Sequence, residues 1–165
     1  MADLTHFDDK GNARMVDISE KLPTERLARA SCSVSLQPAT LQAIRAGRIG
    51  KGDVLQVARL AGIMAAKQTP HLIPLCHVIA LSSVEIQFDT SGDRVHIESS
   101  VQAVDRTGAE MEALVAAATA ALTIYDMCKS IDRGMAIEHV RLEEKSGGKS
   151  GHFVREASSD DQSKA

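Results

Sequence analysis

The fold of this chain is decided by the segment at residues 110–131, which reads EMEALVAAATAALTIYDMCKSI. Six of its residues recur at helical spacing: Met111, Leu114, Val115, Ala118, Leu122 and Tyr125. The alanines between them favour helix and allow a neighbouring element to approach closely. The segment therefore predicts a long helix from about Glu110 to about Ile131, with Gly134 as its end signal.

Strands are predicted on both sides of this helix. Residues 78–88 and 94–104 are typical of two strands, and the turn at residues 90–93 joins them as a hairpin. Residues 26–36 end in alternating apolar and small polar residues, and residues 135–142 supply another short strand.

Two further helices are predicted before the hairpin. One begins near Pro38 and stops at Gly47, and the next begins at the N-cap Asp53 and runs to about Lys67. Pro70 and Pro74 are expected to bracket a tight connection. This order of helices and strands predicts an α+β sandwich, with helices on one face of an antiparallel sheet.

Length and composition bound the architecture and the class of protein. The chain has 165 residues, of which 44% are hydrophobic and 2% aromatic. These values predict one domain over residues 15–154, with a core of small aliphatic side chains. Residues 1–14 are expected to form a flexible arm, and residues 155–165 a disordered tail. Few aromatic rings argue against single-stranded nucleic-acid binding by base stacking.

Net charge, hydropathy and cysteine spacing argue against several other classes of protein. The formal net charge is −3, so no global basic field attracts nucleic acid or an anionic membrane. No transmembrane segment or signal peptide is expected, which predicts a cytoplasmic protein. Cys32, Cys76 and Cys128 are too widely spaced to suggest a disulfide framework or a zinc site.

Two glycine-rich basic segments are candidates for binding phosphate. Lys51 lies between two glycines directly before a predicted helix, although a surface turn has the same pattern. Residues 145–151, KSGGKSG, lack the first glycine of a Walker A loop, because Glu143 stands there. That segment is a loop that could close over phosphate, or a flexible linker.

Titratable side chains gather in three short segments. Cys76 and His77 follow an apolar run, and histidine suits proton transfer near neutral pH. Asp126 and Lys129 are three positions apart and share a helix face. Glu112 and Asp126 are 14 positions apart, or about 21 Å along one helix. If both act in one pocket, either the helix begins later than predicted or two subunits share the site; we favour the second interpretation.

Taken in order, these segments resemble the MoaC family, the cyclic pyranopterin monophosphate synthases, over residues 4–153. The matching segments are KGDV at 51–54, ARLAGI at 58–63, IPLCH at 73–77, EMEAL at 110–114, TIYDMCK at 123–129 and KSGGKSG at 145–151. The chain departs from the family pattern at Val78, where proline is common, and at Ala109, where valine is frequent. The first departure could alter how rigidly His77 is presented.

The resemblance implies a ferredoxin-like α+β fold, assembled as a hexamer (a trimer of dimers) with active sites at a subunit interface. It implies conversion of 3′,8-cyclo-7,8-dihydro-GTP to cyclic pyranopterin monophosphate with release of pyrophosphate, a lyase step of molybdenum cofactor biosynthesis. A radical S-adenosylmethionine enzyme would supply the substrate. The proton-transfer steps require no redox cofactor, and Mg²⁺ can accompany the triphosphate.

The resemblance also assigns roles. Asp126 would be the principal acid–base residue, with Lys51 and Lys129 as acid–base groups or as partners for phosphate charge. Six residues would surround the substrate: Leu75, Cys76, His77, Glu110, Met111 and Glu112. Lys67, Lys145 and Lys149 are candidates for the triphosphate, since its charge needs several cations.

Three alternatives remain open. A non-catalytic nucleotide-binding module would use the same lysines and glycines but would not need Asp126 beside Lys129. A phosphohydrolase would turn over ordinary nucleotides such as GTP. A purely structural interaction protein would lose no activity on substitution of Lys51 or Asp126.

Overall fold

The computed structural model of the protein describes residues 6–156. Residues 1–5 of the predicted arm and residues 157–165 of the predicted tail lie outside this range. The elements follow the order β1 (Thr24–Ser35), α1 (Pro38–Arg45), α2 (Val54–Leu72), β2 (Leu81–Asp89), β3 (Arg94–Asp105), α3 (Glu110–Cys128), β4 (Ala136–Ser146) and β5 (Phe153–Val154).

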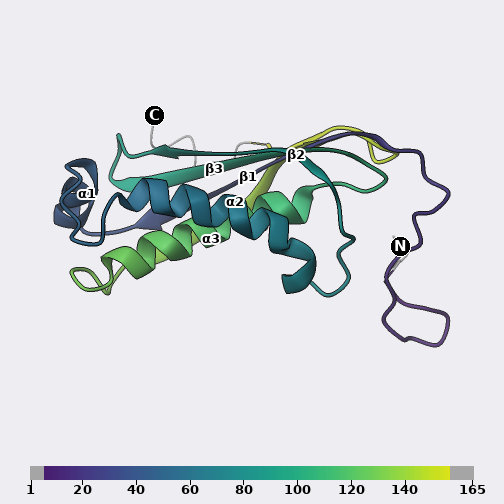
Figure 1. Ribbon diagram of the computed structural model, residues 1–165, viewed down its shortest axis with the longest axis horizontal. Coiled ribbons are helices and arrows are strands. Elements are labelled where there is room, and N and C mark those ends of the chain that lie inside the picture. The colour runs from purple at the N-terminus through teal and green to yellow at the C-terminus, as the bar shows by residue number, and fades with distance from the viewer. Residues whose placement is uncertain (1–5, 157–165) are drawn as a thin grey trace.

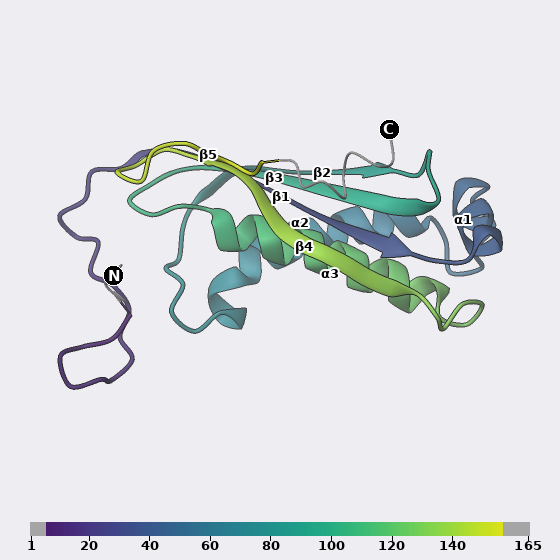
Figure 2. The ribbon, with the colours of Figure 1, turned by 180° about the vertical axis from the view of Figure 1, so that it is seen from behind.

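The strands form one antiparallel sheet in the order β2-β3-β1-β4-β5. Helices α2 and α3 cover one face of this sheet, and α1 lies at one end (Figures 1 and 2). Without α1 and β5, the chain order is β-α-β-β-α-β with the β4 edge beside β1, which is the ferredoxin-like arrangement. The predicted α+β sandwich is confirmed.

Small side chains build the core, as the low aromatic content predicts. Along β1 every second residue from Ala28 to Val34 is buried against the helices. The alanines of α3 at positions 113, 116, 117, 120 and 121 are fully buried. A Cβ on Gly62 of α2 would overlap with Ile86 Cδ1 and would lie 2.8 Å from Ala116 O. Glycine at this position therefore lets α2 pack directly on α3.

Helices α2 and α3 run antiparallel to each other. Lys51, just before α2, reaches Asp126 near the end of α3, while Gly62 in the middle of α2 contacts the middle of α3. The end of α2 therefore lies beside the beginning of α3. By length and composition α3 could cross a membrane, but half of its apolar window is buried and it packs on the sheet and on α2.

Several predicted boundaries are wrong. Helix α2 continues through Pro70 to Leu72, so the proline removes one backbone hydrogen bond near the end of the helix without ending it. Helix α3 ends at Cys128, since the amides of Ile131 and Asp132 both bond back to the Cys128 carbonyl and form a turn. Residues 78–80 lie outside β2, whereas β4 extends to Ser146.

Candidate active site

Three predicted residues meet at the end of α3, and we call them the helix-end cluster: Lys51, Asp126 and Lys129. Lys129 Nζ lies 2.6 Å from Asp126 Oδ1, and Lys51 Nζ lies 3.7 Å from Oδ2. Lys51 Nζ also donates to the backbone carbonyl of Asp126 at 3.0 Å. All three side chains are at least half exposed, so a ligand in solution can reach them.

Local sequence explains why Lys51 reaches this cluster. Gly52 has φ 105°, a conformation that favours glycine, and its amide closes a turn onto Ile49 O. Asp53 then caps α2, since its side chain accepts hydrogen bonds from the amides of Leu55 and Gln56. The predicted N-cap is confirmed, and the turn carries Lys51 to the end of the neighbouring helix.

Electrostatics keep the helix-end cluster ionised. The hydrogen bond from Lys129, followed by the charges of Lys129 and Lys51, lowers the pKa of Asp126. The same ion pair raises the pKa of Lys129. At neutral pH the cluster therefore offers a carboxylate that can accept a proton, flanked by ammonium groups that can stabilise negative charge.

A second group lies at the beginning of α3, and we call it the helix-start cluster: Cys76, His77, Glu110, Glu112 and Lys145. Lys145 Nζ lies 3.0 Å from Glu110 Oε1 and donates to Ser150 Oγ at 2.9 Å. His77 Nε2 lies 2.7 Å from Val16 O. Because a carbonyl only accepts, Nε2 carries a proton, which leaves Nδ1 as the ring position that can meet a ligand.

Burial changes the chemistry of the helix-start cluster. Glu112 is 3% exposed, and burial raises the pKa of its carboxyl to about 7. Burial, together with the nearby Glu112 charge, raises the pKa of Cys76. A raised pKa disfavours the thiolate, so Cys76 is a poor candidate for a nucleophile. Burial also raises the pKa of Cys128 and Cys32.

The pKa of Glu112 predicts a pH-dependent stability. The carboxyl titrates near 4.5 when unfolded and near 7 when folded, so between these values the native state holds more protons. The free energy of unfolding should therefore fall as pH rises through this window, by up to about 3 kcal/mol. In Glu112→Gln this loss should disappear, as measured by urea unfolding at about pH 5 and about pH 8.

The exposed carboxylate of Glu85 in β2 provides the matched control, because Glu85→Gln should keep the native pH dependence. Parallel stability profiles for the native chain and Glu112→Gln would show that Glu112 is ionised in the folded protein at neutral pH.

Four further predicted residues, Leu75, Met111, Lys67 and Lys149, form no ion pair within residues 6–156. Leu75 and Met111 are half-buried and directly precede Cys76 and Glu112. Lys67 is exposed in the last part of α2, and Lys149 is exposed in the glycine-rich loop after β4. This loop and the beginning of α3 lie at the same end of the molecule, opposite α1 (Figures 1 and 2).

Sequence reasoning missed Arg26, which stands against the glycine-rich loop. A Cβ on Gly148 would overlap with the Arg26 guanidinium. The sequence carried one signal for it. Side chains alternate between the two faces of a strand, and Arg26 is a charged residue on the face of β1 whose other side chains point into the core.

The two clusters lie at opposite ends of one continuous helix. Helix α3 runs unbroken from Glu110 to Cys128. The predicted separation of Glu112 and Asp126, about 21 Å at 1.5 Å per residue, therefore stands. A helix that begins later than predicted is excluded as an explanation for how both groups could serve one pocket.

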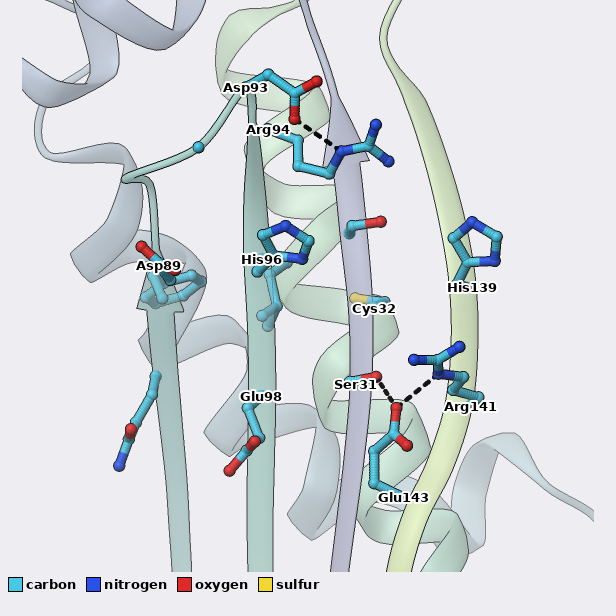
Figure 3. A pocket seen from close by; sticks show the side chains of 15 residues that line it. Ser31, Cys32, Asp89, Asp93, Arg94, His96, Glu98, His139, Arg141 and Glu143 are labelled. Atoms are coloured by element: carbon cyan, nitrogen blue, oxygen red, sulfur yellow. Dashed lines mark hydrogen bonds and ion pairs between the residues drawn. The ribbon is translucent and has the colours of Figure 1, made fainter. Parts of the chain in front are cut away.

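The open face of the sheet holds a pocket of about 730 Å³ that contains none of the predicted site residues. Figure 3 shows Arg94 paired with Asp93, and Glu143 paired with Ser31 and Arg141. Glu143 accepts from Ser31 and from Arg141, and Arg94 pairs with Asp93 and Glu138. Because these groups already satisfy one another, the pocket is a weaker candidate for catalysis than the two clusters.

Comparison with known proteins gives one family. The MoaC family model matches residues 15–148. Cyclic pyranopterin monophosphate synthase of Thermomicrobium roseum is 57% identical over 94% of this chain and 95% of its own. The Desulforamulus reducens protein of that name is 57% identical over 96% of this chain and 98% of its own. Cyclic pyranopterin monophosphate synthase 3 of Mycobacterium tuberculosis is 54% identical over 92% of this chain and 86% of its own. The family match includes every member of both clusters.

Proposed function

Since the chain belongs to the MoaC family, we propose that it forms cyclic pyranopterin monophosphate from 3′,8-cyclo-7,8-dihydro-GTP and releases pyrophosphate. The observation that carries this proposal is the ionised Asp126 held between Lys51 and Lys129 at an accessible surface. Ring opening, ring closure and attack of a hydroxyl on the α-phosphate all need proton transfer and charge stabilisation. The helix-end cluster supplies both.

Each cluster has a distinct part in this proposal. Asp126 accepts the proton of the attacking group, and the Lys51 and Lys129 ammonium groups stabilise negative charge on phosphate oxygen. At the helix-start cluster, His77 Nδ1 accepts a hydrogen bond and the Glu112 carboxyl reads the guanine-derived edge. No redox cofactor is needed for these steps, and Mg²⁺ can accompany the triphosphate.

The active site is shared between subunits in this proposal. The clusters are about 21 Å apart on one rigid helix, which is too far for one compact pocket. A second copy must therefore bring its helix-end cluster to the helix-start cluster of the first. Isologous pairing around a two-fold axis does this, because it sets α3 antiparallel to the partner's α3 and creates two equivalent sites.

The exposed surface of the helices supports such pairing. Val57, Leu60 and Met64 follow one face of α2 at helical spacing, and each is at least 43% exposed. Leu122 of α3 is 58% exposed. Large apolar side chains gathered on one face mark an interaction surface. Three such pairs would give the hexamer, acting as a soluble cytoplasmic enzyme downstream of a radical S-adenosylmethionine GTP cyclase.

Turnover tests the proposed function. Purified protein should release pyrophosphate from freshly prepared cyclised GTP under anaerobic conditions and form a pterin that fluoresces after oxidation. It should leave GTP itself unchanged, whereas a phosphohydrolase would cleave GTP. Binding of the cyclised nucleotide without product would instead favour the nucleotide-binding module, and neither binding nor product would favour a structural role.

A further inference from the structure

We propose that Asp132 is a positioning residue: its buried carboxylate joins α1 to the end of α3 and thereby holds Lys51 against Asp126. The inference rests on the proposed function, which gives the helix-end cluster its part in catalysis. It adds to that cluster a residue that acts through its neighbours and that lies outside the segments of the family resemblance.

Asp132 is buried in the turn that follows α3. It is 3% exposed, and both of its carboxylate oxygens accept hydrogen bonds from backbone amides. Oδ2 accepts from the Gln37 amide at 2.8 Å, and Oδ1 accepts from the Gly134 amide at 3.1 Å. Within residues 6–156 Asp132 forms no ion pair. Because a buried carboxylate is costly unless such donors satisfy it, these two bonds determine where it lies.

One of these bonds joins two separate elements. Gly134 is two positions away, so its bond only closes a local turn, whereas Gln37 is 95 positions away and is the N-cap of α1. Helix α1 and the end of α3 lie at the same end of the molecule (Figures 1 and 2). The other end of α1 is held by Arg45, which donates to Gly92 O in the β2–β3 turn. Asp132 is therefore the residue that joins α1 to the helix carrying Asp126.

Hydrogen bonds connect α1 to Lys51. The Arg48 amide bonds back to Ala43 O within α1, and the Gly52 amide closes the turn that follows. Lys51 lies in this second turn, directly before α2. A displacement of α1 would therefore displace the ammonium group of Lys51.

The buried thiol of Cys128 lies near both ends of this connection. Burial and the charge of Asp132 raise the pKa of Cys128, whereas the charge of Lys51 lowers it. The two charged groups therefore lie around one side chain at the end of α3. A misplacement of about 1 Å in a catalytic group can cost roughly a hundredfold in rate, so loss of the bond to α1 should affect turnover.

Two variants remove this bond from opposite sides. Asp132→Ser can still accept from the Gly134 amide, as serine does in such turns, but it is too short to reach Gln37 as well. Gln37→Pro removes the donor and leaves the carboxylate in place. Gln37 is exposed and has φ −67°, a value that proline adopts. Asp89→Ser is the matched control, because Asp89 accepts from the Ser91 amide over the same two-residue spacing in a turn outside both clusters.

The pKa of Asp126 reports the position of Lys51 without turnover. It can be measured by ¹³C NMR titration of the carboxyl group, assigned by its absence in Asp126→Asn. Lys129 and then Lys51 lower this pKa, so it should rise in Lys51→Ala. It should rise likewise in Asp132→Ser and in Gln37→Pro. Removal of the Asp132 charge alone would lower it instead, so the sign separates positioning from a direct effect of charge.

Turnover of cyclised GTP is the second measurement, made where urea unfolding shows each variant to be folded. Asp132→Ser and Gln37→Pro should each lower kcat about tenfold to a hundredfold and change KM less than about threefold. The double variant should lose no more than the weaker of the two, because both changes remove one bond. Asp89→Ser should match the native chain in kcat and in the pKa of Asp126.

A native pKa of Asp126 in both variants would overturn the inference, as would multiplied losses in the double variant. Lower stability with native kcat would also overturn it, since Asp132 would then have only a structural role. Should Asp132→Ser fail to fold, Gln37→Pro alone decides the outcome. If the pKa of Asp126 rises in the variants but the native chain forms no product, the inference stands and the proposed reaction fails.

Discussion

Asp126→Asn should lower turnover of cyclised GTP by roughly a hundredfold to ten-thousandfold, the usual contribution of a general acid–base group. The carboxamide has nearly the same shape but cannot accept a proton. It also leaves Lys51 and Lys129 without the carboxylate that lies 3.7 and 2.6 Å from them. Pyrophosphate release under saturating substrate measures the effect.

Two controls separate chemistry from folding and binding. Asp126 is largely exposed, so Asp126→Asn should unfold at the same urea concentration as the native chain. Glu85→Gln removes an exposed carboxylate of β2 that belongs to neither cluster, and should keep full turnover. Undiminished turnover in Asp126→Asn would leave the reaction in place but remove Asp126 from its mechanism.

The architecture was predictable because local signals agreed with one another. The alanine-rich segment predicted α3, the cap at Asp53 predicted the beginning of α2, and the turn at residues 90–93 predicted the hairpin of β2 and β3. Together these elements predict a layer of helices packed on one face of a sheet, because each helix must bury its apolar face.

The details that failed depend on contacts between distant residues. Lys145 and Ser146 looked like part of a glycine loop, yet they extend β4 because they pair with Ala28 and Leu27, more than a hundred positions away. The two-residue strand β5 exists only through its pairing with Glu144 and Lys145. No local pattern encodes such pairing, which depends on where the chain returns in space.

The same distinction applies to the site. Spacing along a helix predicted that Asp126 and Lys129 share a face, and the structure confirms their ion pair. The approach of Lys51 needs the antiparallel packing of α2 and α3, and residue spacing alone could not place it. Arg26 was missed since its partners in the loop are more than a hundred positions away, although its charge on the buried parity of β1 was visible.

Mixing two inactive variants should restore activity if subunits share the site. Asp126→Asn damages the helix-end cluster, and His77→Ala damages the helix-start cluster. In a mixed pair, one site combines both lesions and the other combines the intact cluster of each subunit. Random pairing should therefore give about a quarter of the native turnover, because half of the pairs are mixed and each has one intact site of two.

A second mixture tests whether recovery requires the two lesions to lie in different clusters. Asp126→Asn and Lys51→Ala both damage the helix-end cluster, so each site of a mixed pair receives a damaged copy and turnover should not recover. Both mixtures can be prepared by co-expressing the two variants in equal amounts with one common affinity tag, so that pairs assemble at random and are purified without selection. Recovery in neither mixture would place the whole reaction within one subunit, and one of the two clusters would then have no part in it, since about 21 Å of unbroken helix separates them.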